Sequence, residues 1–122
     1  MLLTGCSSEW MQARERAERA NLTAPINPRE EILAFMRTYL NDPTHVRDAY
    51  VSEPTLRDVA GVRRYSVCLR YNARKSSGQY AGSKDSLVLF RDGHLDRIVD
   101  SARELCKDAE YRPFPELQRL TR

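Results

Sequence analysis

The sequence has few of the residues on which most catalytic and metal sites depend. It contains two histidines, His45 and His94, and three cysteines. Neither Cys68 nor Cys106 has a cysteine or histidine at the spacing of a zinc site, and no local nucleophile motif surrounds them. The sequence therefore predicts no metal, no cofactor and no catalytic set. The remaining enzymatic hypothesis uses His45 or His94 with a carboxylate or thiol within hydrogen-bond reach.

Long apolar runs and a strong charge imbalance are also absent. No segment approaches the roughly 20 apolar residues that a membrane-spanning helix requires. The net charge of +3 is too small to indicate nucleic-acid binding, which a concentrated basic stripe would accompany. Hydrophobic residues at 41% and charged residues at 30% are typical of one globular domain with a modest core.

The loop at residues 76–84 contains glycine, serine and lysine without forming a known phosphate motif. Gly82-Ser83-Lys84 has the wrong order for a nucleotide-binding loop, in which the lysine precedes the serine or threonine. A mobile hairpin loop is expected here. Tyr80, at its tip, is a candidate partner contact.

The first residues of the chain indicate a location. In the segment Leu3-Thr4-Gly5-Cys6, a small residue precedes the cysteine, and an aliphatic residue stands two positions before that small residue. Two serines follow the cysteine. This segment resembles the lipobox of bacterial lipoproteins. The resemblance implies that the Cys6 thiol receives a diacylglycerol, that acyl chains such as palmitate hold the protein on a membrane, and that a peptidase removes residues 1–5 as the remnant of a signal peptide.

The expected signal peptide is incomplete. A secretory signal has a charged start and an apolar stretch of about 7 to 15 residues, whereas only Met1, Leu2 and Leu3 precede the rest of the lipobox. We expect either a start codon further upstream or a truncated chain. The lipobox predicts an outer-membrane lipoprotein that faces the periplasm; if the match is chance, the alternative is a cytoplasmic protein.

Setting Cys6 aside leaves an even number of cysteines. In an oxidising envelope compartment, this remainder predicts a disulfide between Cys68 and Cys106. Such a bridge closes a loop of about 39 residues and contributes roughly 4 kcal/mol in the chain-entropy model. The alternative is a cytosolic protein with three free thiols.

Residues 6–26 are expected to form a tether with a polar helix. Ser8 to Ala20 combines an N-cap serine with strong helix formers, but its apolar stripe is thin. A solvated stalk and a partner surface both explain it. Trp10 is expected either at the lipid headgroup level or packed on the domain.

Residues 27–122 are predicted to form a single α+β domain. An amphipathic helix at 28–40, with Asn27 as N-cap and Pro28 at its first position, should pack on one face of a small antiparallel sheet of three to four strands. Strands are expected at 46–52, 63–75, 85–91 and 95–99, and Asp92-Gly93 predicts a hairpin turn. A turn of helix or an irregular connection is expected at 55–61. Asp100 should cap a short helix at 101–108, and an extended tail follows.

The strand expected at 63–75 has alternating character. Its odd positions from Tyr65 to Tyr71 are apolar or aromatic and should face the core, whereas its even positions, Cys68 among them, should face water. The disulfide would then tie the C-terminal segment over the outside of the sheet. Arg64, Arg70 and Arg74 are candidate contacts for an anionic polymer or acidic partner, but arginines on a solvated strand face explain the same residues without any ligand, and that explanation is preferred.

The order of elements, two helices and then a meander of strands, is similar to the small lipoprotein subunits of the outer-membrane barrel assembly machine. Their glycine-centred interhelical motif is absent here. The leading interpretation is a lipid-anchored envelope protein with a non-catalytic binding or scaffolding role, whose partner is an envelope protein or a cell-wall component. The alternative is a periplasmic domain that holds a small ligand between helix and sheet, as cystatin-like folds do. That alternative requires a pocket on which Tyr39, Tyr50, Tyr65 and Tyr71 converge.

Overall fold

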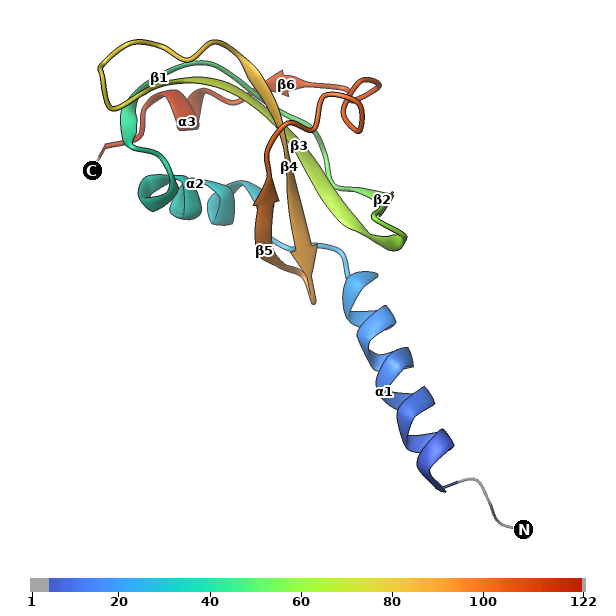
Figure 1. Ribbon diagram of the computed structural model, residues 1–122. Coiled ribbons are helices and arrows are strands. Elements are labelled where there is room, and N and C mark those ends of the chain that lie inside the picture. Colours follow the sequence, from blue (N-terminus) through green and yellow to red (C-terminus); the bar gives the residue numbers. More distant parts are fainter. Residues whose placement is uncertain (1–4, 122) are drawn as a thin grey trace.

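The fold is built around one long strand, β3. In the computed structural model, residues 5–121 are described, with side chains described from residue 8 onward. The helices are α1 (Gly5–Asn21), α2 (Pro28–Tyr39) and α3 (Pro115–Gln118). The strands are β1 (Asp42–Val51), β2 (Thr55–Val59), β3 (Val62–Arg74), β4 (Lys84–Arg91), β5 (His94–Val99) and β6 (Arg112–Pro113), as Figure 1 shows.

The six strands form one antiparallel sheet, which corrects the expected three to four strands. Its order is β5-β4-β3-β1-β6, and β2 pairs with the first half of β3. β1 pairs with the second half of β3, so β1 and β2 follow each other along the same edge. The fold is therefore a β-rich one with two main helices, and the expected small α+β sheet is wrong.

Strand β2 replaces the irregular connection that the sequence predicts. Ala60 and Gly61 both have positive φ, at 50° and 81°. Two such residues form the tight turn whose twist suits a β-hairpin. This turn folds β2 back onto β3, so that Val59 pairs with Val62 and Thr55 with Ser66.

Helix α2 covers one face of the sheet and encloses the main core (Figure 1). Pro28 starts the helix as expected, but the Asn27 side chain makes no capping hydrogen bond. Ile32 and Met36 point into a cluster with apolar residues of β1, β3 and β4, and the C-terminal segment adds Phe114 and Leu117. The interior between helix and sheet is thus filled by side chains.

The opposite face of the sheet carries a second, smaller core. Cys68, Leu87 and Leu89 point to this face, where Ala102 and Cys106 cover them. We call residues 101–111, which lie across this face, the strap. The expectation that this face of β3 is open to water is therefore wrong at its centre, where Ser66 and Cys68 are both buried, Cys68 under the strap and Ser66 in contact with Arg57 of β2.

The strap consists of turns, and the helix expected at 101–108 does not form. Ser101 has a φ of 59°, so it cannot continue from an Asp100 cap into a right-handed helix. Ala102 N–H donates to the carbonyl of Asp85 at 3.0 Å, and Ala109 N–H donates to the carbonyl of Cys106 at 3.1 Å. These bonds tie the segment to β4 and tighten its turns.

Helix α1 projects away from the sheet (Figure 1). Its described side chains up to Arg19 are exposed, and the helix includes Ser8 instead of being capped by it. Trp10 is 66% exposed and contacts Arg14 of the same helix, so it does not pack on the domain. At the other end, Asp92 N–H donates to the carbonyl of Ala20 at 2.6 Å, which joins the helix to the β4–β5 turn. No helix in the described part is long and apolar enough to cross a membrane.

Candidate functional site

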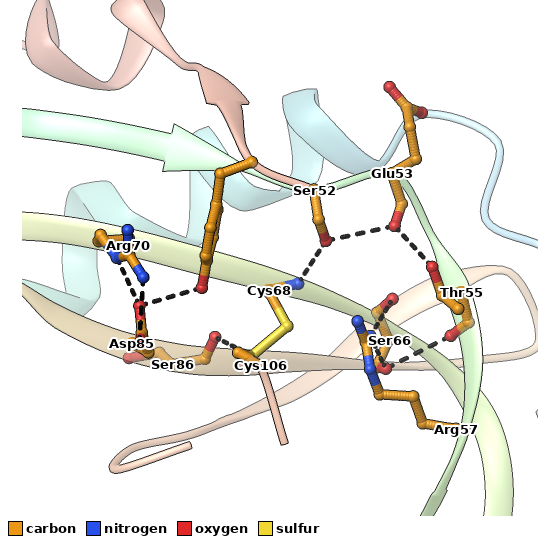
Figure 2. Close-up of a disulfide and its surroundings, with 11 residues drawn as sticks. Ser52, Glu53, Thr55, Arg57, Ser66, Cys68, Arg70, Asp85, Ser86 and Cys106 are labelled. Atoms are coloured by element: carbon orange, nitrogen blue, oxygen red, sulfur yellow. Dashed lines mark hydrogen bonds and ion pairs between the residues drawn. A yellow bond between two sulfur atoms is a disulfide. The ribbon is translucent and has the colours of Figure 1, made fainter. Parts of the chain in front are cut away.

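The predicted disulfide between Cys68 and Cys106 is confirmed and joins β3 to the strap (Figure 2). The two Cα atoms are 5.8 Å apart, and both residues are buried. Ser52, at the end of β1, accepts a hydrogen bond from Cys68 N–H at 2.8 Å through its hydroxyl. The bridge leaves neither sulfur as a thiol nucleophile, so the strap face is organised around a structural bond.

Arg70, on one side of the disulfide, is held in a fixed orientation. Its Nε donates to Asp85 Oδ1 at 2.7 Å, and its guanidinium lies 4.3 Å from the ring centre of Tyr111. The Tyr111 hydroxyl donates to the same carboxylate oxygen at 3.0 Å. Arg70, a candidate contact for an anionic partner, therefore has a defined position. Its side chain is still 40% exposed, so a partner could reach it.

The electrostatics of this triad follow from these contacts. Burial acts to raise the pKa of Asp85, but the hydrogen bonds from Arg70 and Tyr111 and the charges of Arg70 and Arg103 outweigh it and lower that pKa. Burial and the bond to Asp85 raise the pKa of the Tyr111 hydroxyl. Bonding to the carboxylate raises the pKa of Arg70. The site therefore holds a carboxylate, a neutral phenol and a guanidinium at neutral pH.

Arg57, on the other side of the disulfide, is a residue that the sequence analysis missed. Its Nη1 donates to the Ser66 hydroxyl at 2.7 Å and to the Ser66 carbonyl at 3.3 Å (Figure 2). It forms no ion pair with a carboxylate of the described residues, and burial lowers its pKa. The sequence did not indicate this position because β2 was not expected to be a strand. The pairing of β2 with β3 is what places residue 57 beside β3.

The strap creates a hollow on each side of the disulfide. One, of about 240 Å³, lies between β2 and the end of the strap and includes Arg57 and Glu110. The other, of about 520 Å³, lies between the start of β4 and the start of the strap and includes Arg70 and Arg103. Both hollows depend on where the disulfide holds the strap.

Arg64 and Arg74 do not join Arg70 in one cationic patch. Arg64 is buried, and its Nη2 donates to Asp96 Oδ2 at 2.8 Å and to the Phe90 carbonyl at 3.2 Å. Arg74 lies 3.8 Å from Asp42. Of the three arginines, Arg70 alone borders one of these two hollows.

Tyr80 folds back onto the sheet and does not stand free at a loop tip. Its hydroxyl donates to the carbonyl of His45 at 2.7 Å, and its ring centre lies 3.9 Å from the Arg47 guanidinium. Arg74 approaches the same ring at 5.8 Å. The tyrosine therefore closes the loop against β1 and β3.

The two histidines are exposed and stand apart from both hollows. His45 Nδ1 lies 2.9 Å from the Thr44 hydroxyl, and His94 Nδ1 lies 3.4 Å from Glu31 Oε1. His94 thus has a carboxylate nearby, on the surface, and neither histidine lines the strap hollows. The geometry gives no enclosed acid–base pair around either of them.

The four tyrosines of the ligand-binding alternative do not converge. Tyr39 and Tyr71 line a rim hollow of about 260 Å³, whereas Tyr50 and Tyr65 do not. Burial, together with a 2.8 Å hydrogen bond to Asp100, raises the pKa of Tyr39 to about 12. The filled core under α2 counts against a ligand held between helix and sheet.

Metal coordination finds no support among the described side chains, which contain no cluster of three or more His, Cys, Asp or Glu able to hold an ion. Of the lipobox residues, Leu3 and Thr4 lie outside the described part, and the side chain of Cys6 lies outside it as well. No protein-family model, curated protein or solved structure matches this chain.

Proposed function

We propose that the protein is a lipid-anchored outer-membrane protein that faces the periplasm and has a non-catalytic binding role. The disulfide between Cys68 and Cys106 is the observation that carries this proposal. Disulfides form and persist in oxidising compartments such as the periplasm and are rare in the cytosol. With those two cysteines paired, Cys6 is the one cysteine left for acylation.

The geometry of α1 supports the anchoring part of the proposal. The helix has 17 residues, and at 1.5 Å per residue it is about 25 Å long. Cys6 and the exposed side chains of Trp10 and Met11 lie toward its free end, while its other end is bonded to the β4–β5 turn. Amphipathic rings such as that of tryptophan favour the membrane interface. Lipid at Cys6 would therefore set Trp10 near the headgroups and hold the sheet away from the bilayer.

The strap face supports the binding part. It presents two hollows with charged walls, and a covalent bond holds the segment that forms them. Preorganised walls of this kind lower the ordering cost that a ligand or partner would otherwise incur on binding. The partner in this proposal is an envelope component, either a protein or a cell-wall polymer.

Mass spectrometry of the protein, expressed from its own locus and extracted from host membranes, tests the anchor. We expect a mature chain that begins at Cys6 and carries acyl groups, in the outer-membrane fraction. Cys6→Ser should abolish the acyl mass and release the protein from that fraction. The Cys68→Ala, Cys106→Ala double variant is the matched control and should stay acylated, because both sites are buried and alanine leaves no unpaired hydroxyl there. An unmodified chain that retains Met1, found in the cytosolic fraction, would refute the proposal.

A further inference from the structure

The hollow beside Arg70 has an excess of positive charge. We call it the basic hollow; its walls are Arg70, Ser83, Lys84, Asp85, Ser101 and Arg103. Asp85 is the one carboxylate among them, and it is already bonded to Arg70 and to Tyr111. Lys84 and Arg103 form no side-chain hydrogen bond or ion pair within the described part of the chain. Two positive charges are therefore left without a bonded counter-charge.

The walls of the basic hollow are fixed before any ligand arrives. Asp85 and Tyr111 hold the Arg70 guanidinium from two sides. The bond from Ala102 N–H to the Asp85 carbonyl fixes the backbone between Ser101 and Arg103 against β4. Four residues further on, the disulfide at Cys106 prevents the strap from lifting. These constraints fix the Arg70 guanidinium and the backbone that carries Arg103 at the edge of the hollow.

We propose that the basic hollow binds a phosphate monoester group. Such a group carries close to two negative charges at neutral pH and three acceptor oxygens. It would match Lys84 and Arg103, the two cations without a bonded counter-charge, and the hydroxyls of Ser83 and Ser101. A carboxylate or a phosphodiester carries one charge and would leave one cation unmatched. Arginine and lysine are the residues that proteins use for phosphate recognition.

The site differs from a nucleotide-binding loop. Gly82-Ser83-Lys84 lacks the required residue order, and the group is held by side chains of β3, β4 and the strap. The volume of about 520 Å³ admits a sugar-sized body attached to the phosphate. The hollow would bind this group with or without lipid on Cys6, so the proposal goes beyond the function stated above.

Titration of the full chain with two phosphate monoesters tests this site. It also shows whether the site takes the phosphate group from a free ester or from a lipid headgroup. Glucose 6-phosphate, followed by calorimetry, represents a free ester, and vesicles that contain phosphatidic acid, followed by flotation, represent a lipid ester. Phosphatidylglycerol vesicles of equal charge density serve as the phosphodiester comparison. Binding to either monoester supports the proposal, and the arm that responds identifies the source. If the protein binds neither glucose 6-phosphate nor phosphatidic acid, the proposal is overturned.

Paired variants separate the basic hollow from general surface charge. Lys84→Gln with Arg103→Gln should weaken monoester binding by about tenfold or more, since a hydrogen bond to a charged group has that value. Lys75→Gln with Arg91→Gln removes the same charge from exposed sites outside the hollow and should leave affinity within about twofold. Affinity should also fall between pH 7.5 and 5.5, because the second phosphate proton binds near pH 6.

Equal loss in the two paired variants, or equal binding of phosphatidylglycerol and phosphatidic acid, would show that nonspecific charge explains the binding and would overturn the site. Neither result bears on acylation of Cys6, which the mass measurement tests separately.

Discussion

Removal of the disulfide should cost a large part of the stability of this protein. The bridged residues are 38 positions apart. The chain-entropy model then gives a loss of about 4 kcal/mol at 25 °C for the variant Cys68→Ala, Cys106→Ala. A domain of this size is typically stable by about 5–15 kcal/mol, so the variant should fold but unfold at a clearly lower urea concentration. Alanine is preferred to serine because both sites are buried.

The assay is urea denaturation followed by far-ultraviolet circular dichroism. Tryptophan fluorescence is unsuitable because the one tryptophan, Trp10, is exposed on α1. Cys6→Ser in every variant prevents thiol exchange. The dependence of the unfolding free energy on urea should steepen in the variant, since its unfolded chain exposes more surface.

Hydrogen exchange locates the effect. The Ala102 and Cys106 amides, which donate within the strap face, should lose protection in the double-alanine variant before the amides of α2 do. A loss of stability below about 1 kcal/mol, far from the 4 kcal/mol of the chain-entropy model, would refute the reasoning. So would equal protection of the strap amides with and without the bridge.

Three further substitutions test other parts of the fold. Asp85→Asn should destabilise the protein most at pH 7 and progressively less as the pH falls from about 5 to 2, because a carboxyl with a lowered pKa loses its stabilising charge in that range; a pH-independent difference in urea midpoint would contradict this. Met36→Ala empties a fully buried position and should cost about 3 kcal/mol in the same assay, whereas a cost below about 1 kcal/mol would contradict the described core. Gly93→Ala should cost more than Gly78→Ala in thermal melts: both residues have positive φ, but a Cβ at Gly93 would lie 3.3 Å from the Ala24 carbonyl oxygen and one at Gly78 would meet nothing. Equal melting temperatures would contradict that contact.

Local signals predicted the elements that depend on local physics. Pro28 and the following apolar spacing located α2 to within one residue at its end. Asp92-Gly93 predicted its hairpin turn, in which both residues have positive φ. The cysteine count predicted the pairing of Cys68 with Cys106. Each of these inferences needed only the identity of neighbouring residues or, for the disulfide, the even number of cysteines left after Cys6.

The elements that were missed depend on long-range pairing. β2 has no clear alternation, and it is a strand because its turn returns it to β3. β6 has two residues and exists because Tyr50 and Val51 provide partners. Residues 101–108 contain helix formers, but their attachment to Asp85 and Cys68 imposes turns. The basic hollow was missed for the same reason, since Lys84 and Arg103 meet only after the strap is in place.

The link between β3 and the strap has a consequence for resistance to proteases. It closes a covalent ring that contains the exposed Lys75 and Lys84. A trypsin-like enzyme that cuts after either lysine would open the backbone without separating the pieces, because the two halves would still be joined through sulfur. The nicked protein would stay in one piece, heavier only by the water that hydrolysis adds, until a reductant was added, and damage to this loop would go undetected on a nonreducing gel.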